Sequence, residues 1–93
     1  MTILESVEKW EQMPLARVLF DLANMGFSSK MEVYPANCES GVMASVRLEK
    51  DGSFSGNVIG STPSIVKERI VKWADGQGIR DFLKEGGNET EKI

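Results

Sequence analysis

The sequence predicts a two-layer α+β domain in which helices pack on one face of a three-stranded antiparallel sheet, in the order α-α-β-β-β-α. Apolar residues recur with the 3.6-residue spacing of an amphipathic helix in residues 14–26 and again in residues 62–74. Between residues 27 and 60 they alternate with polar residues, as in strands that are buried on one side only. Because such strands have a single apolar face, both main helices are expected on that side.

The first helical segment is short. Thr2 and Glu5 have the T-x-x-E spacing of a capping box, in which hydroxyl and carboxylate satisfy the first free backbone amides. Trp10 falls on the apolar face of this segment. Pro14 ends it near Met13, because the residue before a proline disfavours helical backbone.

The second helix has the clearest pattern. Pro14 suits its first position, where the missing N–H costs no hydrogen bond, and Gly26 supplies the left-handed residue that ends it. Arg17 and Asp21 are expected on the side opposite the apolar stripe. The stripe consists of Leu15, Val18, Leu19, Leu22 and Met25.

Three strands follow. Met31 and Val33 are expected to point toward the helices, and Asp51-Gly52 is typical of a tight hairpin turn. Gly56 falls on the apolar face, where a missing side chain lets a helix approach the sheet. The opposite face is expected to be open and to carry Lys30, Glu32, Tyr34, Met43, Ser45, Arg47, Glu49, Ser55 and Asn57.

A third helix closes the domain. Thr62 is its expected N-cap, followed by a proline in the first turn, and Val71 is expected on its polar side. Its apolar face consists of Ile65, Val66, Ile70 and Trp73. One further helical turn that docks on the core is predicted from Ile79, Phe82 and Leu83.

The length of the chain limits its organisation. Ninety-three residues are enough for one hydrophobic core and too few for two, so we expect a single domain at residues 1–85. The polar, glycine-led residues 86–93 are expected to form a disordered tail. A homodimer through the open sheet face or an edge strand is left open by the sequence.

Histidine, the commonest general base and metal ligand, is absent. The chain has no histidine and one cysteine, Cys38, so it lacks the commonest general base, a Cys-His pair and a zinc site. Residues 51–56 have the form of the opening of a calcium loop, but Thr62 stands where the bidentate glutamate is required. The sequence therefore predicts a protein that is not an enzyme, with no catalytic residues, no metal site and no cofactor.

Two further observations bear on the compartment. No apolar run approaches the roughly 20 residues that span a bilayer, and the N-terminus lacks the basic start and apolar core of a signal peptide. A lone cysteine forms no internal disulfide, so nothing indicates an oxidising environment. We expect a cytoplasmic protein with no membrane contact.

The open sheet face is the predicted site of function. Tyr34, Met43 and Arg47 belong to the residue types enriched in the cores of protein interfaces, and Glu32 and Glu49 are expected to assist them. Such residues also occur on the solvent side of antiparallel sheets that bind nothing, an alternative that the sequence leaves open. The first hypothesis is a non-catalytic protein-binding module.

The alternative is a nucleic-acid-binding domain. The helix, three strands and closing helix, with the stretch from Lys50 to Lys67, resemble the double-stranded RNA-binding domain. That family places a lysine cluster at the start of its second helix to grip phosphates, whereas residues 61–66 here contain no cation. A net charge of −3 also argues weakly against a polyanion binder. The candidate contacts are Lys67, Lys72 and Arg80.

A second resemblance covers residues 14 to 75. A helix that ends in Gly26-Phe27-Ser28, followed by three strands and the helix start Gly60-Ser61-Thr62-Pro63, is similar to small α-β-α sandwich domains encoded by bacteriophages. The resemblance implies a phage or mobile-element accessory protein. It also implies that the partner is a host or defence-system protein, which this chain inhibits or modulates by covering a surface, as in counter-defence.

Overall fold

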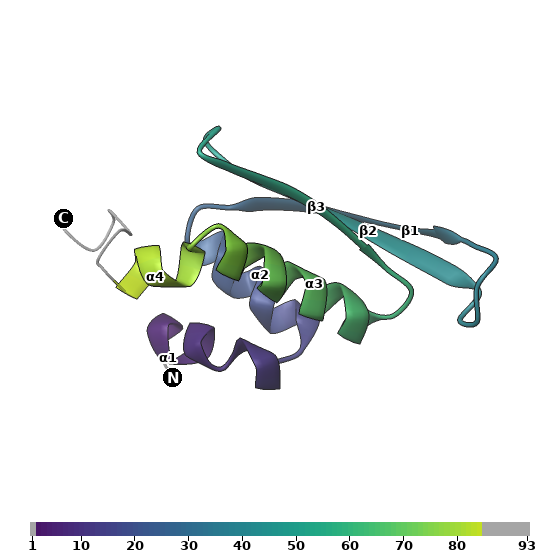
Figure 1. The fold of residues 1–93 in the computed structure, drawn as a ribbon, viewed down its shortest axis with the longest axis horizontal. Coiled ribbons are helices and arrows are strands. Elements are labelled where there is room, and N and C mark those ends of the chain that lie inside the picture. The colour runs from purple at the N-terminus through teal and green to yellow at the C-terminus, as the bar shows by residue number, and fades with distance from the viewer. Residues whose placement is uncertain (1, 85–93) are drawn as a thin grey trace.

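The computed structural model describes residues 2–84 and the side chains of residues 2–81. The predicted class and order are confirmed: helices precede and follow a three-stranded antiparallel sheet, and all of them lie on one side of it (Figure 1). The predicted tail, residues 86–93, lies outside the described residues. The elements are α1 (Ile3–Glu8), the 3-10 helix η1 (Trp10–Gln12), α2 (Leu15–Asn24), β1 (Ser28–Pro35), β2 (Val42–Lys50), β3 (Phe54–Gly60), α3 (Pro63–Gly76) and α4 (Ile79–Lys84).

The residues predicted to begin and end the helices do so, except that Pro14 lies one position outside its helix. Thr2 and Glu5 form the capping box of α1, and the Thr62 hydroxyl accepts a hydrogen bond from the Ile65 N–H at the start of α3. Gly26 has a φ of +98° and follows α2. Pro14 is the N-cap of α2 and not its first residue, because its extended ψ of 162° lies outside the helical region.

The sheet is a simple meander in the order β1-β2-β3. Residues 51–53 connect β2 to β3, and Asp51 and Gly52 have φ values of 43° and 74°, as the two central positions of a type I′ turn require. The Ser53 N–H closes this turn by donating to the Lys50 carbonyl at 2.7 Å. Met31 pairs with Val46 in the β1–β2 ladder, which fixes the face of every other residue in these strands.

Gly56 has the role that its position predicts. It lies on the helix side of β3, and a Cβ placed there would lie 2.2 Å from Nε1 of Trp73. That Nε1 donates to the Ser55 carbonyl at 3.2 Å. The missing side chain therefore lets α3 lie directly on the strand.

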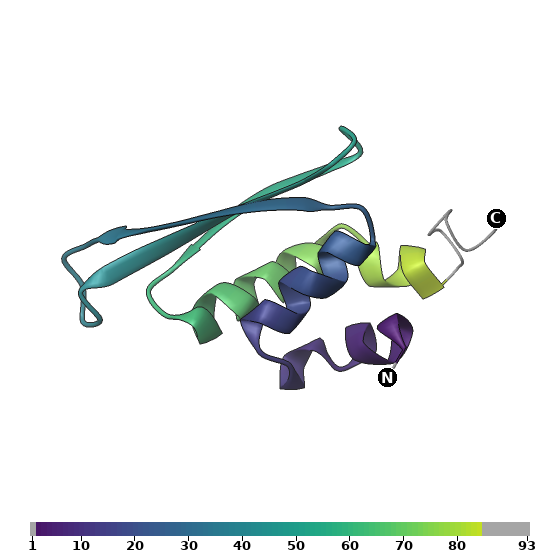
Figure 2. The same cartoon turned by 180° about the vertical axis from the view of Figure 1, so that it is seen from behind.

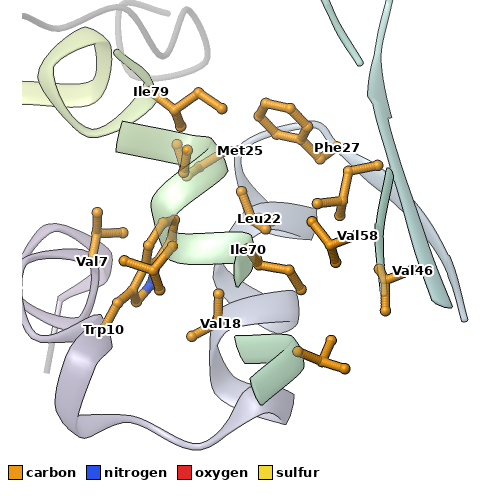
Figure 3. Packing of buried hydrophobic residues seen from close by; sticks show 14 residues of the cluster. Val7, Trp10, Val18, Leu22, Met25, Phe27, Val46, Val58, Ile70 and Ile79 are labelled. Atoms are coloured by element: carbon orange, nitrogen blue, oxygen red, sulfur yellow. The ribbon is translucent and has the colours of Figure 1, made fainter. Parts of the chain in front are cut away.

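The core is deeper than a sheet with one helical layer. Val46 and Val58 of the sheet face α2 and α3, whereas Val7 and Trp10 lie on the far side of these two helices (Figure 3). The short elements α1 and η1 thus cover the side of α2 and α3 that faces away from the sheet (Figures 1 and 2). The buried apolar residues are Val7, Trp10, Val18, Leu22, Met25, Phe27, Val46, Leu48, Val58, Val66, Ile70, Val71, Ala74 and Ile79.

This additional cover corrects two expectations. Val71, expected on the polar side of α3, is 6% exposed, and Asp21, expected on the outer side of α2, is 1% exposed. Both lie on the helix faces that α1, η1 and α4 cover. The predicted turn after α3 is confirmed as α4, with Ile79 buried; the side chains of Phe82 and Leu83 lie outside the described ones.

Candidate protein-binding surface

The strand register places the five predicted contact residues on one face of the sheet, the face away from the helices. Tyr34 of β1 lies directly opposite Met43 of β2, and Glu32 lies opposite Ser45. Tyr34 is 40% exposed and Met43 is half-buried by its neighbours. An aromatic and a thioether side chain therefore meet as a cross-strand pair on a solvent-facing surface.

The same register separates the predicted site into two parts. Arg47 lies four residues beyond Met43 on β2, which is about 13 Å along the strand. There it stands between Lys30 of β1 and Asn57 of β3, and Glu49 follows at the next position on this face. The surface consequently has an apolar end at Tyr34 and Met43 and a charged end at Arg47 and Glu49.

One further member of the apolar end is Ile59, which the sequence analysis did not include. Ile59 of β3 lies opposite Ser45 and diagonally across from Met43, and its side chain is 45% exposed. The alternation that places Ser55 and Asn57 on the open face also places Ile59 there, so the sequence pattern was sufficient to predict its position. Tyr34, Met43 and Ile59 together are called the sheet-face patch below.

The charged end is shallowly hollowed. This hollow stays open to solvent and is lined by Arg47, Leu48, Glu49, Ser55, Gly56 and Asn57. Its polar side chains present both signs of charge within one surface. Such an arrangement suits the rim of a protein interface better than an enclosed small-molecule site.

The alternative nucleic-acid contacts lie on the opposite side of the molecule and are already engaged. The Lys67 ammonium donates to the carbonyls of Trp10 and Glu11, at 3.2 and 2.7 Å. Arg80 is paired with the carboxylates of Glu11 and Asp75 at 2.7 Å each, and these hydrogen bonds, that of Asp75 first, raise its pKa.

Lys72 is the exposed member of this group, and Glu68 and Asp75 line the same shallow hollow. The three cations therefore do not form a free basic row. Two of them hold helices together, and the third shares its hollow with two carboxylates.

Cys38 lies in the turn between β1 and β2. Its Sγ donates to the Val42 carbonyl at 3.2 Å, and a hydrogen bond with the Ser40 hydroxyl lowers the pKa of the thiol below its ordinary 9.0. Ser40 also donates to the Ser61 carbonyl at 2.8 Å. These contacts tie the turn to the start of α3. Among the described residues, no three histidine, cysteine, aspartate or glutamate side chains gather to hold a metal ion.

A second uncovered surface lies on the helix side, where the sheet extends past the helices. Met31 and Val33 point toward the helices as predicted, yet they remain 49% and 60% exposed. With the first residues of α2 and α3 they form the walls of a small, almost wholly apolar groove. It is lined by Leu15, Met31, Val33, Val42, Ala44, Ser61, Thr62, Pro63 and Val66.

Within the described part of the chain, none of the helices combines the length and the apolar character that a membrane span requires. Comparison with family models, curated proteins and solved structures gives no match to this chain.

Proposed function

We propose that this chain is a non-catalytic protein-binding module whose contact surface is the open face of the sheet. The observation that carries the proposal is the sheet-face patch, in which Tyr34 and Met43 lie opposite each other with Ile59 diagonal to them. No helix of the described residues covers this face (Figure 1). Large apolar side chains gathered on an otherwise polar sheet face are typical of a protein-binding surface.

The composition of the surface supports a central contact with a charged border. Tyrosine and methionine provide apolar area for the centre, whereas Arg47, Glu49 and Glu32 flank it along the strands. Border charges steer association and select the partner more than they add affinity. The resemblance to phage-encoded domains extends the proposal to the kind of partner: a host or defence-system protein whose surface this chain covers.

The test compares two double variants of the full chain as bait on a surface, with the host's proteins as prey. Tyr34→Ala combined with Arg47→Glu is expected to reduce affinity for the captured partner about tenfold or more, because it removes the aromatic centre and reverses a border charge. The thermal midpoint is expected to stay within a few degrees, since both side chains are exposed.

The matched control is Glu68→Ala combined with Lys72→Glu, which also replaces two exposed side chains, on the opposite side of the molecule. It is expected to bind the partner like the native chain. Capture that survives Tyr34→Ala/Arg47→Glu but is lost in the control pair would place the contact on the helices. A titration with duplex RNA at low salt then tests the nucleic-acid alternative.

A further inference from the structure

We propose that two copies of this chain associate through strand β1, so that their sheets join into one continuous antiparallel sheet around a two-fold axis at Met31. The inference does not depend on the proposed partner. It rests on three observations: a strand edge that no described residue pairs with, a self-complementary order of charges along that edge, and a largely apolar outer face on the neighbouring helix.

The first observation is the free edge. β1 is an outer strand of the sheet, and all eight of its residues are exposed. The Ala36 N–H donates to the Gly41 carbonyl, which continues the β1–β2 ladder and sets its alternation. By that alternation the backbone groups of Ser29, Met31 and Val33 point to the free edge. Pro35 belongs to the same set, and a residue without an N–H is tolerated there because that position has no partner.

The second observation is the order of charges. When β1 pairs with a second β1 around Met31, Lys30 lies opposite Glu32 of the second copy, and Glu32 opposite its Lys30. These are non-hydrogen-bonded positions, where opposed side chains come closest. The backbone groups of Ser29 and Val33 then face each other, so the edge groups of both strands find partners.

Other registers are worse. Centring on Lys30 or on Glu32 places like charges directly opposite each other, which is destabilising. Centring on Val33 sets Met31 against Pro35, which has no N–H to donate at a position that needs one. Among the registers centred on residues 30 to 33, the charges and the proline leave only the one centred on Met31.

The third observation concerns α2, which lies with β1 on one side of the molecule while α3 lies behind them (Figure 2). The face of α2 opposite buried Val18 and Leu22 carries Ala16, Phe20 and Ala23, which are all exposed, Phe20 by 60%. A helix face that meets only water is normally polar. Here it is largely apolar, with the Arg17 guanidinium at its border 5.8 Å from the centre of the Phe20 ring, and in the proposed pair it faces the second copy.

Met31 and Val33 complete this interface on the helix side of the sheet. Both are about half exposed although they point toward the helices. Leu15, in the first turn of α2, lines the same groove, so the axis at Met31 passes close to the start of α2. The small side chain of Ala16 allows the two α2 helices to approach there. A second copy thus covers apolar surface that the single chain leaves in water.

Light scattering of the full chain over a range of concentrations tests the pairing. The native chain is expected to have twice the mass of a 10.3 kDa monomer. Lys30→Glu alone and Glu32→Lys alone are each expected to be monomeric, because each places like charges opposite at two positions. The exchange Lys30→Glu with Glu32→Lys is expected to restore the dimer. Lys72→Glu, which reverses a charge on α3 far from the edge, is expected to remain dimeric.

A cysteine pair gives an independent reading of the register. In a Cys38→Ser background, Met31→Cys places two thiols opposite each other at the axis and is expected to form a disulfide-linked dimer under mild oxidation. Tyr34→Cys places its two thiols about 20 Å apart along the strands and is expected to stay unlinked. A native chain that is monomeric at millimolar concentration would overturn the proposal. So would a dimer that both single charge reversals leave intact, or a cross-link at Tyr34→Cys and not at Met31→Cys.

Discussion

At the scale of single residues, the most demanding position is the buried carboxylate of Asp21. Its Oδ2 accepts hydrogen bonds from the Ser6 hydroxyl and from Nε1 of Trp10, the latter at 3.0 Å. Nε of Arg17 lies 3.2 Å from Oδ1, an ion pair without hydrogen-bond geometry. Burying a charge is costly unless it is paired in this way. The arrangement therefore fixes α1 and η1 in one orientation on α2.

The sequence could predict the position of Gly56 but not the burial of Asp21. Successive side chains of β3 alternate between the two faces of the sheet, and this alternation places Gly56 on the apolar face wherever the helices lie. Its role therefore follows from the local sequence pattern. Asp21 looks like a solvent-exposed residue on α2, because it lies opposite the stripe that faces the sheet. It is buried only because Trp10 and Ser6 pack on that side. The spacing of apolar residues along the sequence does not predict on which face of α2 the short elements α1 and η1 pack.

Gly56 also gives the sharpest residue-level prediction. Gly56→Ala is expected to lower the free energy of unfolding by about 2–3 kcal/mol, because the added Cβ would overlap the indole of Trp73 and push α3 away from β3. Urea denaturation measures the change. Gly76→Ala is the control: a Cβ there meets no atom within 4 Å, and it is expected to leave stability unchanged or raise it by up to about 1 kcal/mol. Equal effects of the two substitutions would contradict the close approach at Gly56.

At the scale of elements, one side chain joins the short helix α4 to three others. Arg80 donates to the Val7 carbonyl of α1 at 3.1 Å, pairs with Glu11 of η1 and Asp75 of α3, and lies 5.5 Å over the ring of Trp10. Its side chain is 14% exposed. The sequence suggested it as a nucleic-acid contact because spacing alone does not show that a cation near a chain end returns to the N-terminal elements.

This contact predicts a dependence of stability on pH. The hydrogen bond from Arg80 lowers the pKa of Glu11 below its ordinary 4.5. A carboxyl with a lowered folded-state pKa contributes stability above its unfolded pKa and loses it as the pH falls through the folded value. Arg80→Gln is therefore expected to lower the thermal midpoint at pH 7, and the difference from the native chain is expected to shrink below about pH 4.5. Thermal melts of both proteins at several pH values between 3 and 7 measure this difference. Lys72→Gln, a similar change at an exposed site, is expected to show no such convergence.

At the scale of the whole molecule, element lengths decide where surface is left uncovered. The nine residues of β2 extend about 30 Å, whereas the ten residues of α2 extend about 15 Å. The sheet must therefore pass beyond the helices, and the long axis of the molecule is 48 Å. The sequence predicted on which face of the sheet Met31 and Val33 lie, but not their exposure. The alternation along a strand gives the face of a residue and does not show whether a helix covers it.

The uncovered end predicts uneven protection along the sheet. Amides near the β1–β2 turn, such as those of Tyr34 and Ala36, are expected to exchange with solvent on the order of tenfold or more faster than those of Val46 and Leu48. The latter two residues are fully buried in the central strand beneath α3, whereas no helix of the described residues lies under the turn. Hydrogen exchange followed by NMR measures the ratio. Equal protection at the two ends would mean that another element or a partner covers the turn.

The placement of the two tryptophans has a practical consequence. Trp10 is buried where η1 meets α2, and Trp73 lies between α3 and the sheet, edge-on to Phe27 at 5.9 Å. The chain has only these two tryptophans, so replacing either one with phenylalanine leaves a single tryptophan whose emission can be followed. The variant that keeps Trp10 then reports on the contact between η1 and α2, and the variant that keeps Trp73 reports on the contact between α3 and the sheet. Fluorescence during denaturation thereby shows whether these two contacts are lost together or one after the other.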